Sequence, residues 1–297
     1  MHVMDDGRRA HYRDFYGPAP DGPVVLVHGN CQAESVRVLL AGTLAPVRMP
    51  PVHELTVDDL PHLHGLLART ELLLSQPVRD GYRGLPLGTA ELAARMPTGG
   101  RVLRWPVIRY AGLHPYVAIV RHRLDMSAVP PVVPYHDLRT LTAAAGLPPG
   151  APPGPDALRE AADMSVQELA RRERDVDVGV SDLLRGLGTA AAHTLNHPGN
   201  PVLIALARRV QAAVGHPADA ADPGRELLGG IRAPLHQPVL DALGLAGAAR
   251  PHWIVDGAEV DDEEVRTAQR AWYTAHPQWV AAGLERHAAR LELLGLV

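Results

Sequence analysis

The stretch Pro23–Leu44 constrains the fold of this chain more than any other. Val24–Val27 is an unbroken apolar run rich in β-branched residues, which is typical of a buried parallel strand. From Ala33 onward the apolar residues recur at helical spacing, so a helix follows the strand after a short turn. A strand that passes through a tight turn into a helix is the repeating unit of an open α/β sheet.

That turn carries the only cysteine of the chain, Cys31. Open α/β sheets bind ligands at the carboxyl ends of their strands, and a helix amino terminus stabilises negative charge. We therefore predict that Cys31 lies in a ligand site and that its pKa is lowered toward the thiolate. The alternative is a buried cysteine that acts as a small hydrophobe. The polar or small neighbours Gly29, Asn30 and Gln32 favour the site.

Two further short segments resemble the first strand. Glu71–Leu74 and Arg101–Arg104 are predicted strands, each is followed by a polar loop, and predicted helices lie between the strands. This alternation predicts an α/β fold with a parallel, doubly wound sheet in the N-terminal half. The C-terminal half is predicted to be mainly helical.

The predicted domain organisation follows from composition. Residues 1–22 are polar and read as an N-terminal arm, and residues 23–146 form the α/β unit with the Gly29–Gln32 turn. Residues 147–155 are a Pro-rich linker. Residues 156–297 are predicted to be a helical part that packs on the sheet.

Two signals locate helices in this last part. Ser165–Glu168 is a capping box, which predicts a helix start there. Val202–Val214 is predicted as a helix that Asn200 caps, with Pro201 at its first position.

Composition excludes several classes of protein. The formal net charge is -4, so the chain as a whole lacks the basic surface of a nucleic-acid-binding protein. A single cysteine rules out an internal disulfide framework, and no apolar run approaches the length of a membrane span. The amino terminus lacks the apolar core of a signal peptide, so we expect a cytoplasmic protein.

A cysteine nucleophile needs a base, and His197 is the best of the histidines. It precedes Pro198, which keeps it out of helix geometry, and it lies in a loop with two of the three asparagines of the chain, Asn196 and Asn200. A loop histidine bonded to the backbone is about equally common. His193 lies four residues earlier, as in zinc-binding helices, but the proline undermines a helix, so no metal is expected.

The polar loops supply binding candidates. Asn30 and Gln76, with Gln32, are candidates for positioning the substrate and for stabilising an oxyanion, because side-chain amides can donate to a developing negative oxygen. The following loop contains Arg79, Tyr82 and Arg83, which suit phosphate groups. The alternative is that these arginines pair with nearby acids at the surface.

Other sequence patterns are weaker. His114, in the third loop, is a secondary candidate for the base and a candidate for the cofactor site. Cys31 and Arg37 match C-x5-R, the skeleton of a phosphatase loop, but Glu34 would place a carboxylate against the phosphate. No dinucleotide fingerprint and no P-loop is present.

The turn Gly29-Asn30-Cys31-Gln32, with Ser75-Gln76-Pro77 and His197-Pro198, resembles the WcbI family of polysaccharide biosynthesis proteins over most of the chain. The resemblance implies that coenzyme A binds and that the protein is an acyltransferase. We expect Gly29, in the Cys31 turn, to be part of the cofactor site. It implies a nucleophile or thiol-ligand role for Cys31 and a base role for His197.

The expected partners are a small-molecule thioester and a sugar, polysaccharide-precursor or secondary-metabolite acceptor. Two alternatives remain open: a Cys-dependent thioesterase or hydrolase of SGNH-like shape, and a non-catalytic protein that binds CoA or a carrier arm.

Overall fold

The computed structural model describes residues 6–18 and 21–297. The chain forms two compact units. The first contains the chain up to Val107 together with Ala170–Asp182 and Asn200–Leu227, and the second contains Ile108–Leu169, Leu183–Gly199 and Leu228–Val297. These units do not follow the boundaries that composition predicted, because the chain passes between them several times.

The first unit is built on a three-stranded parallel sheet, as the sequence predicts. Its strands are β1 (Val24–His28), β2 (Thr70–Ser75) and β3 (Arg101–Arg104), in the order β1-β2-β3. His28 pairs with Ser75, and Ser75 with Arg104, so the three carboxyl ends lie at one edge.

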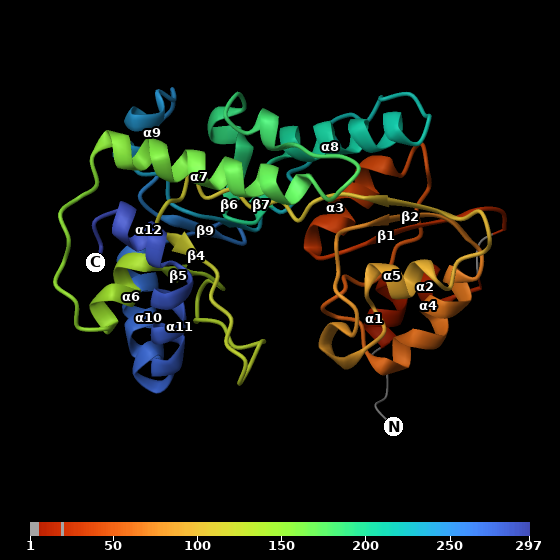
Figure 1. The fold of residues 1–297 in the computed structure, drawn as a ribbon, viewed down its shortest axis with the longest axis horizontal. Coiled ribbons are helices and arrows are strands. Elements are labelled where there is room, and N and C mark those ends of the chain that lie inside the picture. The colour runs from red at the N-terminus through yellow and green to blue at the C-terminus, as the bar shows by residue number, and fades with distance from the viewer. Residues whose placement is uncertain (1–5, 19–20) are drawn as a thin grey trace. The chain divides into compact units, whose positions relative to one another are not determined.

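Helices cover both faces of this sheet, which makes it doubly wound (Figure 1). On one face lie α3 (Cys31–Leu40) and α8 (Asn200–Ala213), which pack on each other. On the other lie α4 (Leu60–Leu67) and α5 (Thr89–Ala93), where Leu26, Leu73 and Leu92 are fully buried in one apolar cluster. Strand side chains alternate between the faces, so each strand feeds both layers.

The segment before β1 is not simply a polar arm. Residues 1–5 and 19–20 of the predicted 1–22 arm lie outside the described residues. Between them, α1 (Asp6–His11) and α2 (Arg13–Tyr16) place Phe15 in the core at 1% exposure. The Tyr16 hydroxyl donates to Asp59 at 2.7 Å and fastens this segment to the unit.

The second unit combines a helical layer with short antiparallel strands. Its helices include α6 (Leu138–Ala144), α9 (Gln237–Leu243), α10 (Asp262–Ala275), α11 (Pro277–Arg286) and α12 (Ala288–Leu293). Both α10 and α11 pack on α6.

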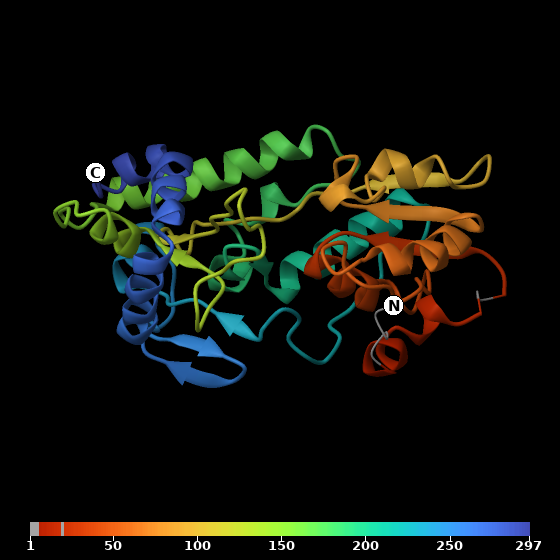
Figure 2. The same ribbon diagram turned by 90° about the horizontal axis from the view of Figure 1, so that it is seen from below.

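Three groups of strands complete this unit. One is the ribbon of β8 (Ile231–Arg232), β9 (Trp253–Val255) and β10 (Ala258–Val260), the blue arrows of Figure 2. The others are two pairs, β4 (Val117–Ala118) with β5 (His136–Asp137) and β6 (Ala192–Thr194) with β7 (His197–Pro198). The C-terminal half is therefore mainly helical, as predicted, with an antiparallel ribbon that the helical periodicity did not indicate.

Helix boundaries in this half differ from the prediction at two places. α7 (Pro155–Glu173) begins ten residues before the predicted capping box, so Ser165 lies inside the helix and its hydroxyl accepts from the Ala111 N–H at 2.8 Å. Asn200 is the first residue of α8 rather than a cap, and its side chain bonds to the backbone of Arg225 and Leu227. Local motifs were satisfied by tertiary partners in both cases.

In the described part of the chain, no helix has both the length and the apolar character needed to cross a membrane. Nor do residues 6–18 and 21–297 gather three or more His, Cys, Asp or Glu side chains into a set that could hold a metal ion.

Candidate functional site

The carboxyl edge of the sheet in the first unit brings the predicted polar turns together. The Cys31 turn (Gly29–Gln32) follows β1, and Gln76 follows β2. The Gln76 N–H donates to the His28 carbonyl at 2.9 Å, which extends the pairing of the two strands by one residue. Segments distant in sequence therefore meet at this edge, as the α/β prediction requires.

Gln76 fixes the Cys31 turn with both ends of its side-chain amide. Its Oε1 accepts from the Asn30 N–H at 2.8 Å, and its Nε2 donates to Gln32 Oε1 at 3.1 Å and to the Pro106 carbonyl at 3.5 Å. Gln76 is 1% exposed and Gln32 is fully buried. The amide that we considered as an oxyanion donor is thus occupied inside the protein, and the geometry favours a positioning role for Gln76 and Gln32.

Gly29 is required by this close approach. A Cβ added at Gly29 would lie 2.5 Å from Gln76 Oε1 and 2.8 Å from its Cδ, which no side chain tolerates without displacing the amide. The Gly29 carbonyl also accepts from the Val52 N–H at 2.7 Å. The glycine that sequence analysis assigned to cofactor binding therefore has a structural reason of its own.

Asn30 caps α3. Its Oδ1 accepts from the Gln32 N–H at 2.9 Å, with the extended backbone of an N-cap residue. The cap uses only the carbonyl oxygen of this side chain, so the structure is compatible with a donor role for the Asn30 Nδ2 group toward a ligand.

Cys31 is the first residue of α3 and is half-buried. Burial raises the pKa of its thiol to about 11, although hydrogen bonds from the N–H groups of Cys31 and Gln32 act in the opposite direction. The prediction of an acidified thiol is wrong for this structure, because loss of hydration outweighs the helix terminus. Cys31 is a neutral thiol at pH 7.

Hydroxyl groups that the sequence analysis did not single out hold the segment after β2. The hydroxyls of Ser75 and Thr89 both donate to the Gln76 carbonyl, at 2.7 and 2.9 Å. The Val78 N–H donates to Thr89 Oγ1 at 3.0 Å. These bonds fix the backbone from which the Gln76 side chain extends; no sequence signal marks them, since serine and threonine are common at strand and helix ends.

His28, the last residue of β1, is 1% exposed, and its Nε2 hydrogen bonds to the Leu87 carbonyl at 3.0 Å. Burial lowers the pKa of its imidazole to about 4, so it is neutral. Within the described residues its Nδ1 has no hydrogen-bond partner. It is a buried neutral histidine three residues before Cys31.

The loop after β2 presents the predicted cationic residues. Arg79 is exposed and makes no hydrogen bond or ion pair with the rest of the described chain. Arg83, which has a positive φ of 53°, donates from Nη1 to the His53 carbonyl at 2.7 Å, and its guanidinium lies 5.9 Å from the Tyr82 ring centroid. Neither arginine pairs with Asp80 in the described structure.

The C-x5-R match carries no phosphatase site. Arg37 donates to both carboxylate oxygens of Glu34, at 2.6 and 3.0 Å, and Arg48 approaches the same carboxylate at 3.1 Å. A guanidinium so occupied on the helix surface is a structural ion pair, and Glu34 would repel a phosphate there.

The two candidate histidines belong to the second unit. His114 is 1% exposed, with Nδ1 3.0 Å from the Pro234 carbonyl, and burial lowers the pKa of its imidazole to about 4. His197, in β7, is half-buried; burial, and then repulsion by His193, lower its pKa to about 4 against the effect of the Leu228 and Ile231 carbonyls. Both are neutral at pH 7. The pairing of His197 with Cys31, which lies in the first unit, stays a prediction.

The asparagines near His197 have structural partners. Asn196 Oδ1 accepts from the Tyr135 hydroxyl at 2.8 Å, and the Tyr135 ring lies 6.2 Å from that of His197 in an edge arrangement. Tyr135 therefore contacts His197 and organises its hairpin, a role that only the fold reveals.

Comparison with known proteins agrees with this architecture. The family model described as "Polysaccharide biosynthesis enzyme WcbI" matches residues 24–219. No curated protein matches the chain.

Among solved structures, one of WcbI is similar with a TM-score of 0.75 and 22% sequence identity, and the match covers 92% of this chain and 96% of that one. It is described as the native form of a novel polysaccharide biosynthesis enzyme, without a disulfide bond between CoA and a cysteine of that protein. The structural likeness establishes the fold, and the family match spans the sheet, the Cys31 turn and the His197 hairpin. This chain belongs to the WcbI family of polysaccharide biosynthesis enzymes.

Proposed function

We propose that this protein is a cytoplasmic, CoA-dependent acyltransferase. It moves an acyl group from a thioester to a hydroxyl or amine of a sugar, a polysaccharide precursor or a secondary metabolite. The observation that carries the proposal is the placement of the Cys31 thiol on the first residue of α3, at the carboxyl edge of a parallel sheet, on a turn that Gln76 holds rigid. Rigid support of a reacting group is what catalytic geometry needs.

Coenzyme A is the proposed cofactor. The WcbI structure described above concerns CoA and a cysteine, and the family match makes Cys31 the corresponding candidate in this chain, since it has no other cysteine. Arg79 has an exposed guanidinium without an internal partner and suits the phosphates, with Tyr82 and Arg83 beside it in the same loop. Gly29 and His114 are retained as further cofactor-site candidates.

The proposed chemistry has two steps. Cys31 Sγ attacks the thioester carbonyl while His197 accepts the thiol proton, and the C–S bond to CoA breaks; CoA leaves as the thiol with that proton. The acceptor hydroxyl then attacks the acyl-cysteine, His197 accepts its proton, and Sγ recovers it as the acceptor ester is released. Asn30 is the proposed oxyanion donor.

The pKa values of these two groups favour a concerted transfer. The pKa of Cys31 is raised to about 11 and that of His197 is lowered to about 4, so a thiolate–imidazolium pair is unfavourable before the substrate binds. Proton transfer must therefore accompany attack on the carbonyl, as in general-base catalysis.

The raised pKa of the Cys31 thiol also favours a second candidate function, a CoA- or carrier-arm-binding protein in which Cys31 only lines the site.

Turnover and covalent trapping test the proposal together. Acetyl-CoA is mixed with the protein alone and with candidate acceptors, and free CoA thiol and the intact protein mass are followed. Because Cys31 is the only cysteine, an added acetyl thioester can be assigned without ambiguity. The variants are Cys31→Ala and Cys31→Ser.

An acetylated Cys31 and acceptor-dependent release of CoA would support the transferase. Steady release without an acceptor would identify the thioesterase instead. Full activity in Cys31→Ala would reject covalent catalysis, and CoA binding without any turnover would leave the binding protein.

A further inference from the structure

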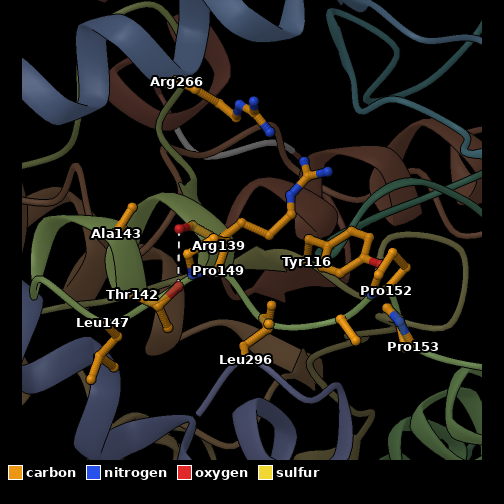
Figure 3. Close-up of a pocket in the computed structure, with 12 residues that line it drawn as sticks. Tyr116, Arg139, Thr142, Ala143, Leu147, Pro149, Pro152, Pro153, Arg266 and Leu296 are labelled. Atoms are coloured by element: carbon orange, nitrogen blue, oxygen red, sulfur yellow. Dashed lines mark hydrogen bonds between the residues drawn. The ribbon is translucent and has the colours of Figure 1, made fainter.

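The second unit contains a ligand-sized cavity of about 510 Å³, remote in sequence from the Cys31 turn (Figure 3). Cavities of roughly 300–1,000 Å³ are those that bind small molecules in proteins. Its walls are α6, the Pro-rich segment, the Leu296 side chain and the Arg266 side chain from α10. The segment 147–155, predicted as a linker, therefore forms the wall of a cavity.

The Pro-rich wall of the cavity is stiff. Pro149, Pro152 and Pro153 line the cavity, and each ring fixes its own backbone torsion. Gly150 is in contact with the Gly295 backbone so closely that a Cβ would clash with the Gly295 carbonyl oxygen. A wall that is rigid before the ligand arrives reduces the entropy lost on binding.

The charged side chains in the lining are both arginines. Arg139 donates through Nε and Nη2 to Asp137 and through Nη2 to Asp262, whereas Arg266 donates through Nε and Nη2 to Glu263. None of these three carboxylates lines the cavity. In the described residues the Nη1 group of each arginine has no hydrogen-bond acceptor, and in Figure 3 the two guanidinium groups point toward one another.

Tyr116 forms a further part of the cavity wall. The Arg139 guanidinium lies 4.4 Å from the Tyr116 ring centroid, which orients the ring in the cavity wall. Its hydroxyl makes no hydrogen bond within the part of the chain that the structure describes. Burial raises the pKa of Tyr116 above its ordinary value, so the phenol keeps its proton. In Figure 3 the hydroxyl end of the ring points toward Pro152.

We propose that this cavity binds a carboxylate with a compact apolar body, such as an arylacetate or a short-chain fatty acid. The carboxylate receives hydrogen bonds from Arg266 and Arg139, and the apolar body packs against the prolines, Leu296 and the Tyr116 ring. Hydrogen bonds from guanidinium to carboxylate are among the strongest in proteins, and no carboxylate of the lining opposes them. The site is independent of the thioester chemistry proposed for Cys31.

Calorimetry on the full chain tests the site with phenylacetate and hexanoate as probes, and with 2-phenylethanol and 1-hexanol as neutral analogues. We expect saturable binding of a carboxylate at about 1 mM or tighter, and at least about tenfold weaker binding of the matching alcohol. Arg266→Gln should weaken carboxylate binding about tenfold or more.

Arg270→Gln is the matched control, because Arg270 lies on the same helix and also donates to Glu263, at 2.6 Å, but does not line this cavity. Its affinity should stay within about twofold of the wild type. Absence of saturable binding of both carboxylates at about 10 mM overturns the proposal, as does equal weakening by Arg266→Gln and Arg270→Gln. If the alcohols bind as tightly as the carboxylates, the site does not recognise the carboxylate group. If inorganic phosphate binds as tightly as the carboxylates, the site does not recognise an apolar body.

Discussion

Removal of the Gln76 amide should weaken the first unit and the Cys31 turn together. The substitution Gln76→Met keeps the length of the side chain but deprives the Asn30 N–H and Gln32 Oε1 of their partner. A buried polar group that loses its hydrogen bond costs about 1–3 kcal/mol, so the loss of two partners should lower the free energy of unfolding by about 2–6 kcal/mol. Gln32→Met removes the acceptor of Gln76 Nε2 and should cost about 1–3 kcal/mol.

The double variant isolates the interaction between the two amides. In Gln76→Met/Gln32→Met neither amide is left facing an apolar group, so the loss should be smaller than the two single losses together, with a coupling free energy of about 2 kcal/mol or more. Urea unfolding followed by tryptophan fluorescence measures it. Trp105 is fully buried and is the one tryptophan of the first unit, so its signal reports on this unit.

Gln167→Met is a control for the substitution itself, since Gln167 is exposed on the part of α7 that belongs to the second unit and has no side-chain hydrogen bond within the described chain. It should change the free energy of unfolding by about 0.5 kcal/mol or less. The network would be refuted if the double variant lost as much free energy of unfolding as the two single variants together. It would also be refuted if Gln76→Met lowered the free energy of unfolding no more than the control does.

Three further predictions concern titration and binding. Burial raises the pKa of the Cys31 thiol to about 11 from 9.0, so this thiol should react with iodoacetamide at pH 8 about 100-fold more slowly than an unburied cysteine of the same intrinsic reactivity. A reaction rate that reaches its plateau below pH 9 would contradict this expectation. Burial lowers the pKa values of His28 and His114 to about 4 from 6.5, so both histidines bind protons more readily in the unfolded chain. The free energy of unfolding should therefore fall as the pH falls from about 6.5 toward 4, by up to about 1.4 kcal/mol per pH unit for each histidine. A midpoint of urea unfolding that stays constant over this pH range would exclude this effect. Arg79→Ala should weaken CoA binding by about 1.5–3 kcal/mol, whereas Arg95→Ala, also at an exposed arginine of the first unit, should not. If calorimetry gave equal affinities for both variants, Arg79 would not bind the CoA phosphates.

The sequence by itself determined the parallel sheet and the place of its polar turns. Val24–Val27, Glu71–Leu74 and Arg101–Arg104 are short strands between helical patterns, and the parallel order follows from the helical connections between them. The spacing also placed Cys31 at a strand end and a helix start. These features depend on local periodicity, which the sequence carries directly.

Only the tertiary structure decided how the candidate groups behave. A helix amino terminus lowers a thiol pKa, but the pKa of Cys31 is raised because neighbouring segments bury it, and burial is a sum over contacts from distant parts of the chain. Likewise, Gln76 looked available as a donor until the fold brought it against Asn30 and Gln32. The capping box at Ser165 lies inside a longer helix, because packing overrides a local signal that is worth about 1 kcal/mol.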